Sequence, residues 1–145
     1  MSFVLDSSVA LTWCFEDEAT PVADALLIRL AEGGAHAPSL WPLEVLNALT
    51  MAERRGRITS QTRYQRIAFL QTLPVALDGQ TAEQAWITAS RLAELHRLTL
   101  YDAAYLELAQ RLELPLATLD VDLRAAASAL GVPLLGLDGE CPESS

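Results

Sequence analysis

The sequence contains no lysine, because all ten basic residues among its 145 are arginines. This absence excludes reactions that need a lysine side chain: a Walker-type phosphate loop, Schiff-base chemistry, and the sites of response-regulator receivers and haloacid-dehalogenase-like phosphatases. Cysteine is scarce too. Cys14 and Cys141 lie near opposite ends of the chain, so they predict neither a disulfide framework nor a zinc site, and we expect a reducing, cytoplasmic location.

Long apolar runs and clustered positive charge are also lacking. The chain begins without a basic segment, and its apolar run over 125–137 is interrupted by Ser128, Gly131 and Pro133, so we expect no signal peptide and no membrane span. The formal net charge is −9, which disfavours non-specific binding to nucleic acid. A function on nucleic acid would therefore need a local basic patch or a bound cation.

The residues that are present favour one α/β domain. Hydrophobic residues make up 51% of the chain, which is enough for one core at this length. Short apolar runs alternate with segments of helical period, a pattern typical of a three-layer α/β/α fold with a mostly parallel, twisted sheet. We expect the domain over residues 1–137 and a polar tail over 138–145. The expected strands are 3–5, 35–37, 74–77, 115–119 and 132–135, and the expected helices are 7–15, 20–32, 40–54, 59–71, 81–98, 99–112 and 120–130.

Four acidic residues occupy comparable places in this pattern. Asp6 and Asp120 each follow an expected strand, Glu44 lies early in the helix after the second strand, and Asp102 opens the helix before the fourth. Each position also suits a helix cap or the helix dipole, which is the simpler interpretation for any one of them. Ligands of parallel sheets bind beyond the carboxyl ends of the strands, so Asp6 and Asp120 would meet there if the first and fourth strands are neighbours.

Carboxylates gathered in a partly dry cleft repel one another unless a cation joins them. The cation expected for oxygen ligands is Mg²⁺ or Mn²⁺. Such a site can hydrolyse a phosphodiester with water as the nucleophile, leaving a 5′-phosphate and a 3′-hydroxyl. We expect Asp6 to be the central ligand, Asp102 and Asp120 to be further ligands, and Glu44 to bind a second ion or to orient the water.

Four segments resemble the PIN-domain family, and more narrowly its VapC-type toxin ribonucleases. They are FVLDSSV at 3–9, APSLWPLEVLNAL at 37–49, LTLYDAAYLELA at 98–109 and LATLDVDLRAAA at 116–127. The resemblance implies an endoribonuclease that depends on Mg²⁺ or Mn²⁺, forms a homodimer, and is inhibited by an antitoxin protein with which it makes a hetero-oligomer. The acidic quartet of the family falls on Asp6, Glu44, Asp102 and Asp120, its hydroxyls on Ser8 and Thr118, and an additional fifth acid on Asp122.

Other side chains have both a structural and a functional interpretation. Asn47 lies one helical turn from Glu44 and either orients that carboxylate or makes a backbone contact. Tyr101 and Tyr105 are expected to pack in the core. The three tryptophans are expected to be core or interface anchors rather than platforms for bases; they are Trp13, Trp41 and Trp86.

Half of the arginines lie within thirteen residues that contain no acid: Arg54, Arg55, Arg57, Arg63 and Arg66. A solvated helical hairpin is the simplest interpretation. Alternatively, this arginine cluster binds the RNA backbone or an acidic or amphipathic antitoxin segment.

Two other functions remain open at this point. A metal-dependent DNA nuclease would share the carboxylates, although this chain has little room for the additional elements that hold duplex DNA. A non-catalytic RNA-binding or scaffold protein would still bind after loss of the acids.

Overall fold

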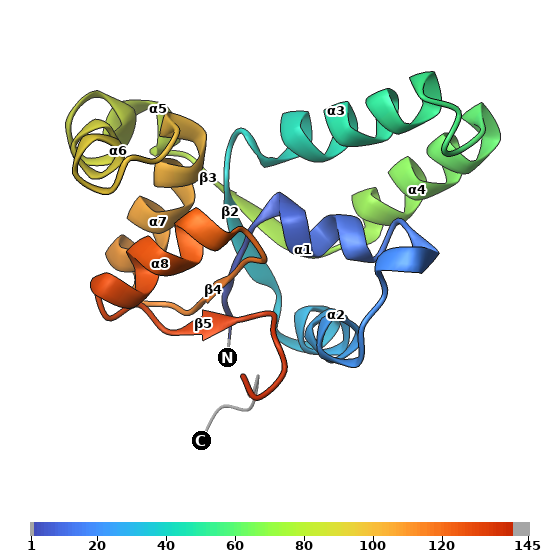
Figure 1. Cartoon of the computed structure of the whole chain (residues 1–145). Helices are drawn as coiled ribbons and strands as arrows, with labels where there is room; N and C mark the ends of the chain where they lie inside the picture. The colour runs from blue at the N-terminus through green and yellow to red at the C-terminus, as the bar shows by residue number, and fades with distance from the viewer. Residues whose placement is uncertain (1, 141–145) are drawn as a thin grey trace.

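Five short strands form one parallel sheet in the computed structural model, which describes residues 2–140 (Figure 1). The strands are β1 (Val4–Leu5), β2 (Ala35–Pro38), β3 (Val75–Asp78), β4 (Leu116–Ala117) and β5 (Leu134–Leu135). Every adjacent pair is parallel, in the order β3-β2-β1-β4-β5. The α/β class and the parallel sheet predicted from the sequence are therefore confirmed.

Helices cover both faces of the sheet (Figure 1). One face carries α1 (Ser7–Thr12), the 3-10 turn η1 (Glu16–Glu18), α2 (Pro21–Gly33), α3 (Trp41–Arg54) and α4 (Ser60–Thr72). The other carries α5 (Thr81–Gln84), the π-helical turn η2 (Ala85–Ala89), α6 (Ser90–His96), α7 (Leu100–Leu112) and α8 (Val121–Ala129). This division is what right-handed crossovers between parallel strands require when the sheet winds in two directions.

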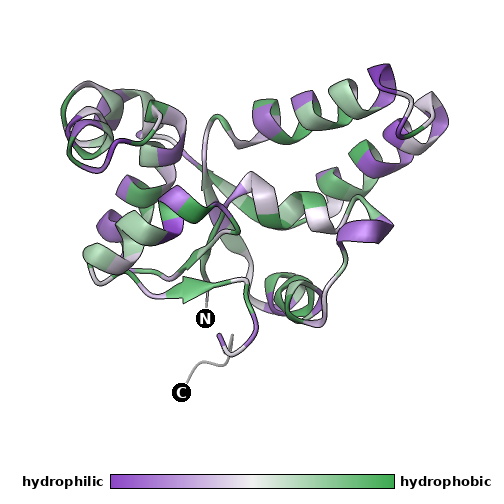
Figure 2. Cartoon of the chain, viewed as in Figure 1, coloured by the Kyte–Doolittle hydropathy of each residue, from purple (hydrophilic) through white to green (hydrophobic). Residues whose placement is uncertain are grey.

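The core lies between the sheet and its helices. Phe3, Val4 and Leu5 are fully buried, as expected for a central strand covered on both faces. On α7, every side chain from Ala103 to Ala109 is buried. Figure 2 shows apolar residues along the strands and hydrophilic ones toward the far end of the α3–α4 hairpin.

The winding of the sheet reverses between β1 and β4. The chain passes from β1 to β2 on one side and from β4 to β5 on the other, and Leu5 is in register with Ala117. The first and fourth strands are thus neighbours, which is the condition under which the sequence predicts that Asp6 and Asp120 meet. Such a reversal is where open parallel sheets bind their ligands.

The helix predicted over 81–98 is present, but it is not a regular α-helix. α5, η2 and α6 follow one another without a gap, so a π-helical turn lies between two α-helical parts, and the helix ends at His96, where Arg97 follows with a left-handed φ of 54°. A π-turn fits an extra residue into a helix and so rotates the side chains that follow. Trp86, in this turn, is 85% exposed, so it is not a core residue, and the alternative expectation that it anchors an interface stays a prediction.

Arg124 joins the end of β4 to the segment after β5. Its Nη1 donates to the backbone oxygen of Thr118 at 2.6 Å, and its Nη2 pairs with Glu140. The predicted tail is therefore anchored at Glu140, while residues 141–145 lie outside the described part. No helix within residues 2–140 is long and apolar enough to cross a membrane.

Arg111 ties the edge strand β3 to α7. Its Nη1 and Nη2 donate to the two oxygens of Asp78 at 3.2 and 2.7 Å, and its Nε donates to Glu107 at 2.7 Å. Glu107 is only 4% exposed, and the hydrogen bonds from Arg111 hold the pKa of Asp78 below its usual value. Because α7 also carries Asp102, this ion network fixes one wall of the candidate site.

Replacing Arg111 with Ala should lower the free energy of unfolding by about 2–4 kcal/mol, because Glu107 and Asp78 would keep their charges without a partner. Urea denaturation at pH 7 measures the change. Arg91→Ala, at an exposed position on α6, is the control and should stay within about 0.5 kcal/mol of the unmodified chain. Equal effects of the two substitutions would show that the network contributes little.

Candidate active site

Asp6 lies at the carboxyl end of β1, and its side chain is the most buried of the four predicted acids. The residue is 3% exposed, and its Oδ2 accepts hydrogen bonds from Ser8 Oγ at 2.6 Å and Thr118 Oγ1 at 2.7 Å. Burial raises the pKa of Asp6, and these two hydroxyls lower it in part. Asp6 is therefore a desolvated carboxylate held in one orientation.

Ser8 and Thr118 also connect Asp6 to the loop after β4. Ser8 Oγ accepts from the backbone N–H of Leu119 at 2.9 Å, and Thr118 Oγ1 accepts from that of Asp120 at 3.1 Å. Each hydroxyl accepts a hydrogen bond from a backbone N–H and donates its own proton to Asp6. These two contacts fix the orientation of each O–H bond. The structure thus brings the two predicted hydroxyls to the first predicted acid.

Glu44 approaches from α3 and contacts α7. Tyr105 OH donates to Glu44 Oε1 at 2.6 Å. Burial is the main cause that raises the pKa of Glu44, the charge of Asp6 raises it further, and hydrogen bonds from Tyr105 and Ser7 lower it. Burial and the contact with Glu44 also raise the pKa of Tyr105, so the phenol remains a hydrogen-bond donor at neutral pH.

Asp102 lies in the first turn of α7, which Thr99 caps by accepting the Asp102 backbone N–H at 3.1 Å. The pKa of Asp102 is raised to about 6, first by burial and then by the charges of Asp120, Asp6 and Glu44. The other three acids of the predicted quartet therefore all act on this carboxyl group, although they come from three other parts of the chain.

Asp120 caps α8. Its Oδ1 accepts from the backbone N–H of Leu123 at 2.8 Å, so the simpler interpretation of this residue as a helix cap is correct, and its charge still acts on Asp102. The proposed fifth acid, Asp122, is exposed in the first turn of the same helix.

Within residues 2–140, no three acidic, histidine or cysteine side chains form a group ready to hold a metal ion. Asp6, Glu44 and Asp120 instead have their own hydrogen-bond partners in Thr118, Tyr105 and Leu123. The donor set still fits a hard cation, because its oxygens are all carboxylate or hydroxyl oxygens and its charges repel one another.

Asn47 does not contact Glu44 through any hydrogen bond among the described residues. It is exposed one turn further along α3 and, together with Glu44, lines a cavity of about 430 Å³ beside the acids. Sequence reasoning missed two supporting residues, Tyr105 and Ser7. The signal for Tyr105 was its spacing of three from Asp102, which places both on one face of α7.

Three of the five clustered arginines bind oxygen atoms of the chain, and Arg54 donates to the sulfur of Met51 at 3.8 Å. Arg57 pairs with Asp17 and Glu18 at 2.9 and 2.8 Å, Arg63 pairs with Glu53, and Arg66 donates to the backbone oxygen of Cys14 at 2.9 Å. The remaining two, Arg54 and Arg55, are exposed where α3 ends.

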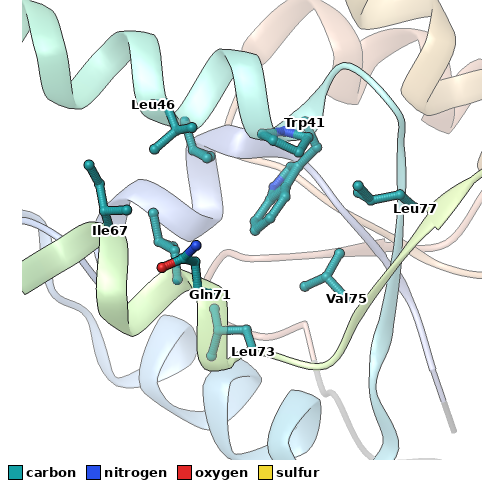
Figure 3. A pocket seen from close by; sticks show the side chains of 10 residues that line it. Trp41, Leu46, Ile67, Gln71, Leu73, Val75 and Leu77 are labelled. Carbon is teal, nitrogen blue, oxygen red and sulfur yellow. The ribbon is translucent and has the colours of Figure 1, made fainter.

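A second cavity, of about 280 Å³, lies between α3, α4 and β3, and we call it the hairpin groove (Figure 3). No carboxylate lines it, and Trp41 extends into it from the start of α3. The indole Nε1 of Trp41 is buried without a hydrogen-bond partner in the described structure. The hairpin groove is therefore an apolar surface separate from the acids.

Residues 3–129 match the PIN domain family. With the acids placed at the reversal of a five-stranded parallel sheet, the chain belongs to the PIN-domain family, as its four segments predict. It is 34% identical to Ribonuclease VapC1 of Mycobacterium tuberculosis over 106 residues, or 72% of this chain and 77% of the relative. It is 29% identical to Ribonuclease VapC3 of Pyrobaculum aerophilum over 133 residues, or 92% of this chain and 100% of the relative.

Solved structures share the fold at low sequence identity. The chain superposes on FitAcB from Neisseria gonorrhoeae with a TM-score of 0.65 and 15% identity, covering 94% of this chain and 97% of the other. It superposes on VapBC2 from Rickettsia felis, a structure bound to a promoter DNA fragment, with a TM-score of 0.65 and 10% identity, covering 95% and 100%.

The raised pKa of Asp102 predicts that Asp102→Asn stabilises the metal-free protein at high pH. The pKa of this carboxyl group in the folded protein, about 6, exceeds the ordinary aspartate value of 3.8. The group therefore contributes most stability below pH 4 and loses that contribution as the pH rises through 6. The asparagine variant has no such loss, so its Tm advantage should grow between pH 5 and pH 8 in EDTA.

The control for this prediction is Asp24→Asn. Asp24 is an exposed acid in the first turn of α2, so this substitution removes a favourable contact with the helix dipole, as Asp102→Asn does in α7, but removes no buried charge. It should bring no Tm gain at pH 8. Identical pH profiles for unmodified protein and Asp102→Asn would mean that neither burial nor the neighbouring charges raise the pKa of Asp102.

Proposed function

We propose that this chain is an endoribonuclease that depends on Mg²⁺ or Mn²⁺ and is the toxin of a toxin–antitoxin pair. The observation that carries the proposal is the convergence of four acids from separate parts of the chain at the reversal of the sheet. Asp6 directly follows β1, and Asp102 lies near enough to Asp6, Glu44 and Asp120 for their charges to act on it. Acidic groups at a sheet reversal suit cation-assisted attack on a phosphodiester. The names of the curated relatives, Ribonuclease VapC1 and VapC3, support RNA as the substrate.

In this proposal Asp6 is the central metal ligand, Asp102 and Asp120 complete the set, and Glu44 binds a second ion or orients the water. When bound, the ion would supply positive charge that offsets the carboxylates and draws electron density from the scissile phosphate and the attacking water. Asp122 stays a possible additional ligand. The nuclease unit would span residues 1–137.

The chain's own groups prepare this site. Ser8 and Thr118 fix one oxygen of Asp6 and so determine where its other oxygen lies. Tyr105 fixes Glu44 from a buried position, and a phenol that stays protonated keeps donating to that carboxylate. These supports orient the acids before substrate arrives, which reduces the reorganisation needed during reaction.

The proposed partners are RNA, an antitoxin protein and a second copy of the chain, in the cytoplasm. The similarity to the VapBC2 structure supports a protein partner. We place the antitoxin on the α3–α4 hairpin, with apolar side chains in the hairpin groove and acidic ones toward Arg54 and Arg55.

Asp6→Asn should reduce cleavage of single-stranded RNA at least about 100-fold, because it removes the central carboxylate while preserving its shape. The measurement is cleavage of end-labelled RNA in Mg²⁺ or Mn²⁺, alongside growth after expression, which the substitution should restore. Millimolar metal should raise the Tm of the unmodified protein but not that of Asp6→Asn.

Glu94→Gln, at an exposed position on α6, is the control and should cleave normally. Unchanged cleavage by Asp6→Asn would refute the assignment of the site. Growth inhibition that survives in Asp6→Asn would favour the non-catalytic RNA-binding alternative, and faster cleavage of DNA than of RNA would favour the DNA nuclease.

Reversing both exposed arginines, Arg54→Glu with Arg55→Glu, should weaken binding of the antitoxin about tenfold or more at low salt, because like charges would then meet at the hairpin. The ligand is the small protein encoded beside this gene, purified and measured by titration calorimetry. Arg91→Glu with Arg97→Glu changes the net charge equally on the opposite face of the sheet. Equal weakening by both pairs would show a net-charge effect and remove the hairpin from the interface.

A further inference from the structure

The cavity beside the acids carries an inference that rests on the proposed function. It measures about 430 Å³ and is lined by Leu40, Leu43, Glu44, Asn47 and Tyr101. Glu44 belongs to the proposed catalytic group, so the cavity adjoins the place where a phosphodiester would be cut. The two parts of the chain that form it are the start of α3 with the residue before it, and the start of α7.

The walls of this cavity expose apolar surface to solvent. Leu43 is 74% exposed and Tyr101 is 63% exposed, although neighbouring positions on the same helices are buried. The expectation that both tyrosines pack in the core is thus correct for Tyr105 and wrong for Tyr101. An exposed aromatic ring and an exposed leucine beside a polar site are typical of a surface that another molecule covers.

The lining selects a flat, uncharged group. The one charged residue in it is Glu44, a carboxylate, which repels a phosphate. The face of Tyr101 and the side chain of Leu43 instead suit the π-face of a nucleobase, because stacking on an aromatic ring needs no positive charge. Asn47 offers both a donor and an acceptor, which is what reading the edge of a base requires.

We propose that this cavity binds one unpaired base of the RNA next to the cleaved phosphodiester, with Tyr101 as the stacking residue and Asn47 as the residue that reads the base edge. A base paired in a duplex has its faces covered by its neighbours, so it reaches the cavity only after leaving the stack. The substrate is therefore single-stranded at this position. The net charge of −9 makes such stacking more important here, because the chain attracts RNA poorly by charge alone.

The test is an abasic scan. A short single-stranded RNA is prepared with one base removed at each position in turn, and binding to the full chain is measured by fluorescence anisotropy in Mg²⁺ with Asp120→Asn as the background that slows cleavage. The background should lose affinity about 5- to 100-fold when the missing base is the docked one. Adding Tyr101→Ala to this background should lower the affinity for intact RNA by the same factor. The affinity of the double variant should then be the same whichever base is removed.

Matched variants separate stacking from other effects. Tyr101→Phe keeps the ring and should keep the affinity within about twofold. Trp86→Ala removes an even more exposed ring, in η2, and should leave the affinity unchanged. Asn47→Ala should still bind RNA, but its affinities for RNA homopolymers of different bases should differ less than those of the unmodified chain. Circular dichroism confirms that each variant is folded.

Three results would overturn the inference: an abasic scan that is flat for the Asp120→Asn background, RNA affinity that Tyr101→Ala leaves unchanged, or loss of antitoxin binding alone in Tyr101→Ala, which would assign the surface to a protein partner. The proposed function fails separately. If the unmodified chain bound RNA through Tyr101 but cleaved none in Mg²⁺ or Mn²⁺, the base site would stand without the nuclease.

Discussion

The parallel pairing of β1 with β4 fixes Asp6, and the rest of the site depends on that one position. The backbone N–H of Asp6 donates to the carbonyl of Ala117 at 3.0 Å, so its Cα is part of the sheet ladder. Its carboxylate then receives the hydroxyls of Ser8 and Thr118 from the two strand ends. A shift of register between these strands would move the carboxylate and its donors together, so the site depends on the pairing rather than on loop conformation.

The fold holds these acids in place against their mutual repulsion. A buried Asp6 and a partly buried Asp102 are less stable as charged groups than they would be in water. The apolar strands and α7 offset that cost through burial of their side chains. Charged side chains that are buried at a cost in stability, in a fold whose other residues suit their positions, are typical of a functional site.

Much of the site was predictable because parallel strands place their carboxyl ends at one edge. That rule located Asp6 and Asp120 from sequence position alone, and the helix-entry pattern located Asp102. The role of Tyr105 was not predictable, because a tyrosine on a buried helix face satisfies core packing and a polar contact equally well. The pairing of Arg57 with Asp17 was hidden for another reason: the two residues are 40 positions apart, and only the tertiary fold brings them together.

Arg124 makes the end of the chain part of this arrangement. Its guanidinium holds the carbonyl of Thr118, whose hydroxyl orients Asp6, and it is itself neutralised by Glu140. Proteolytic cleavage before residue 140 would therefore leave an unneutralised cation on the carbonyl of Thr118, the residue whose hydroxyl orients Asp6. The segment after β5 and the orientation of the buried carboxylate are linked through a single side chain.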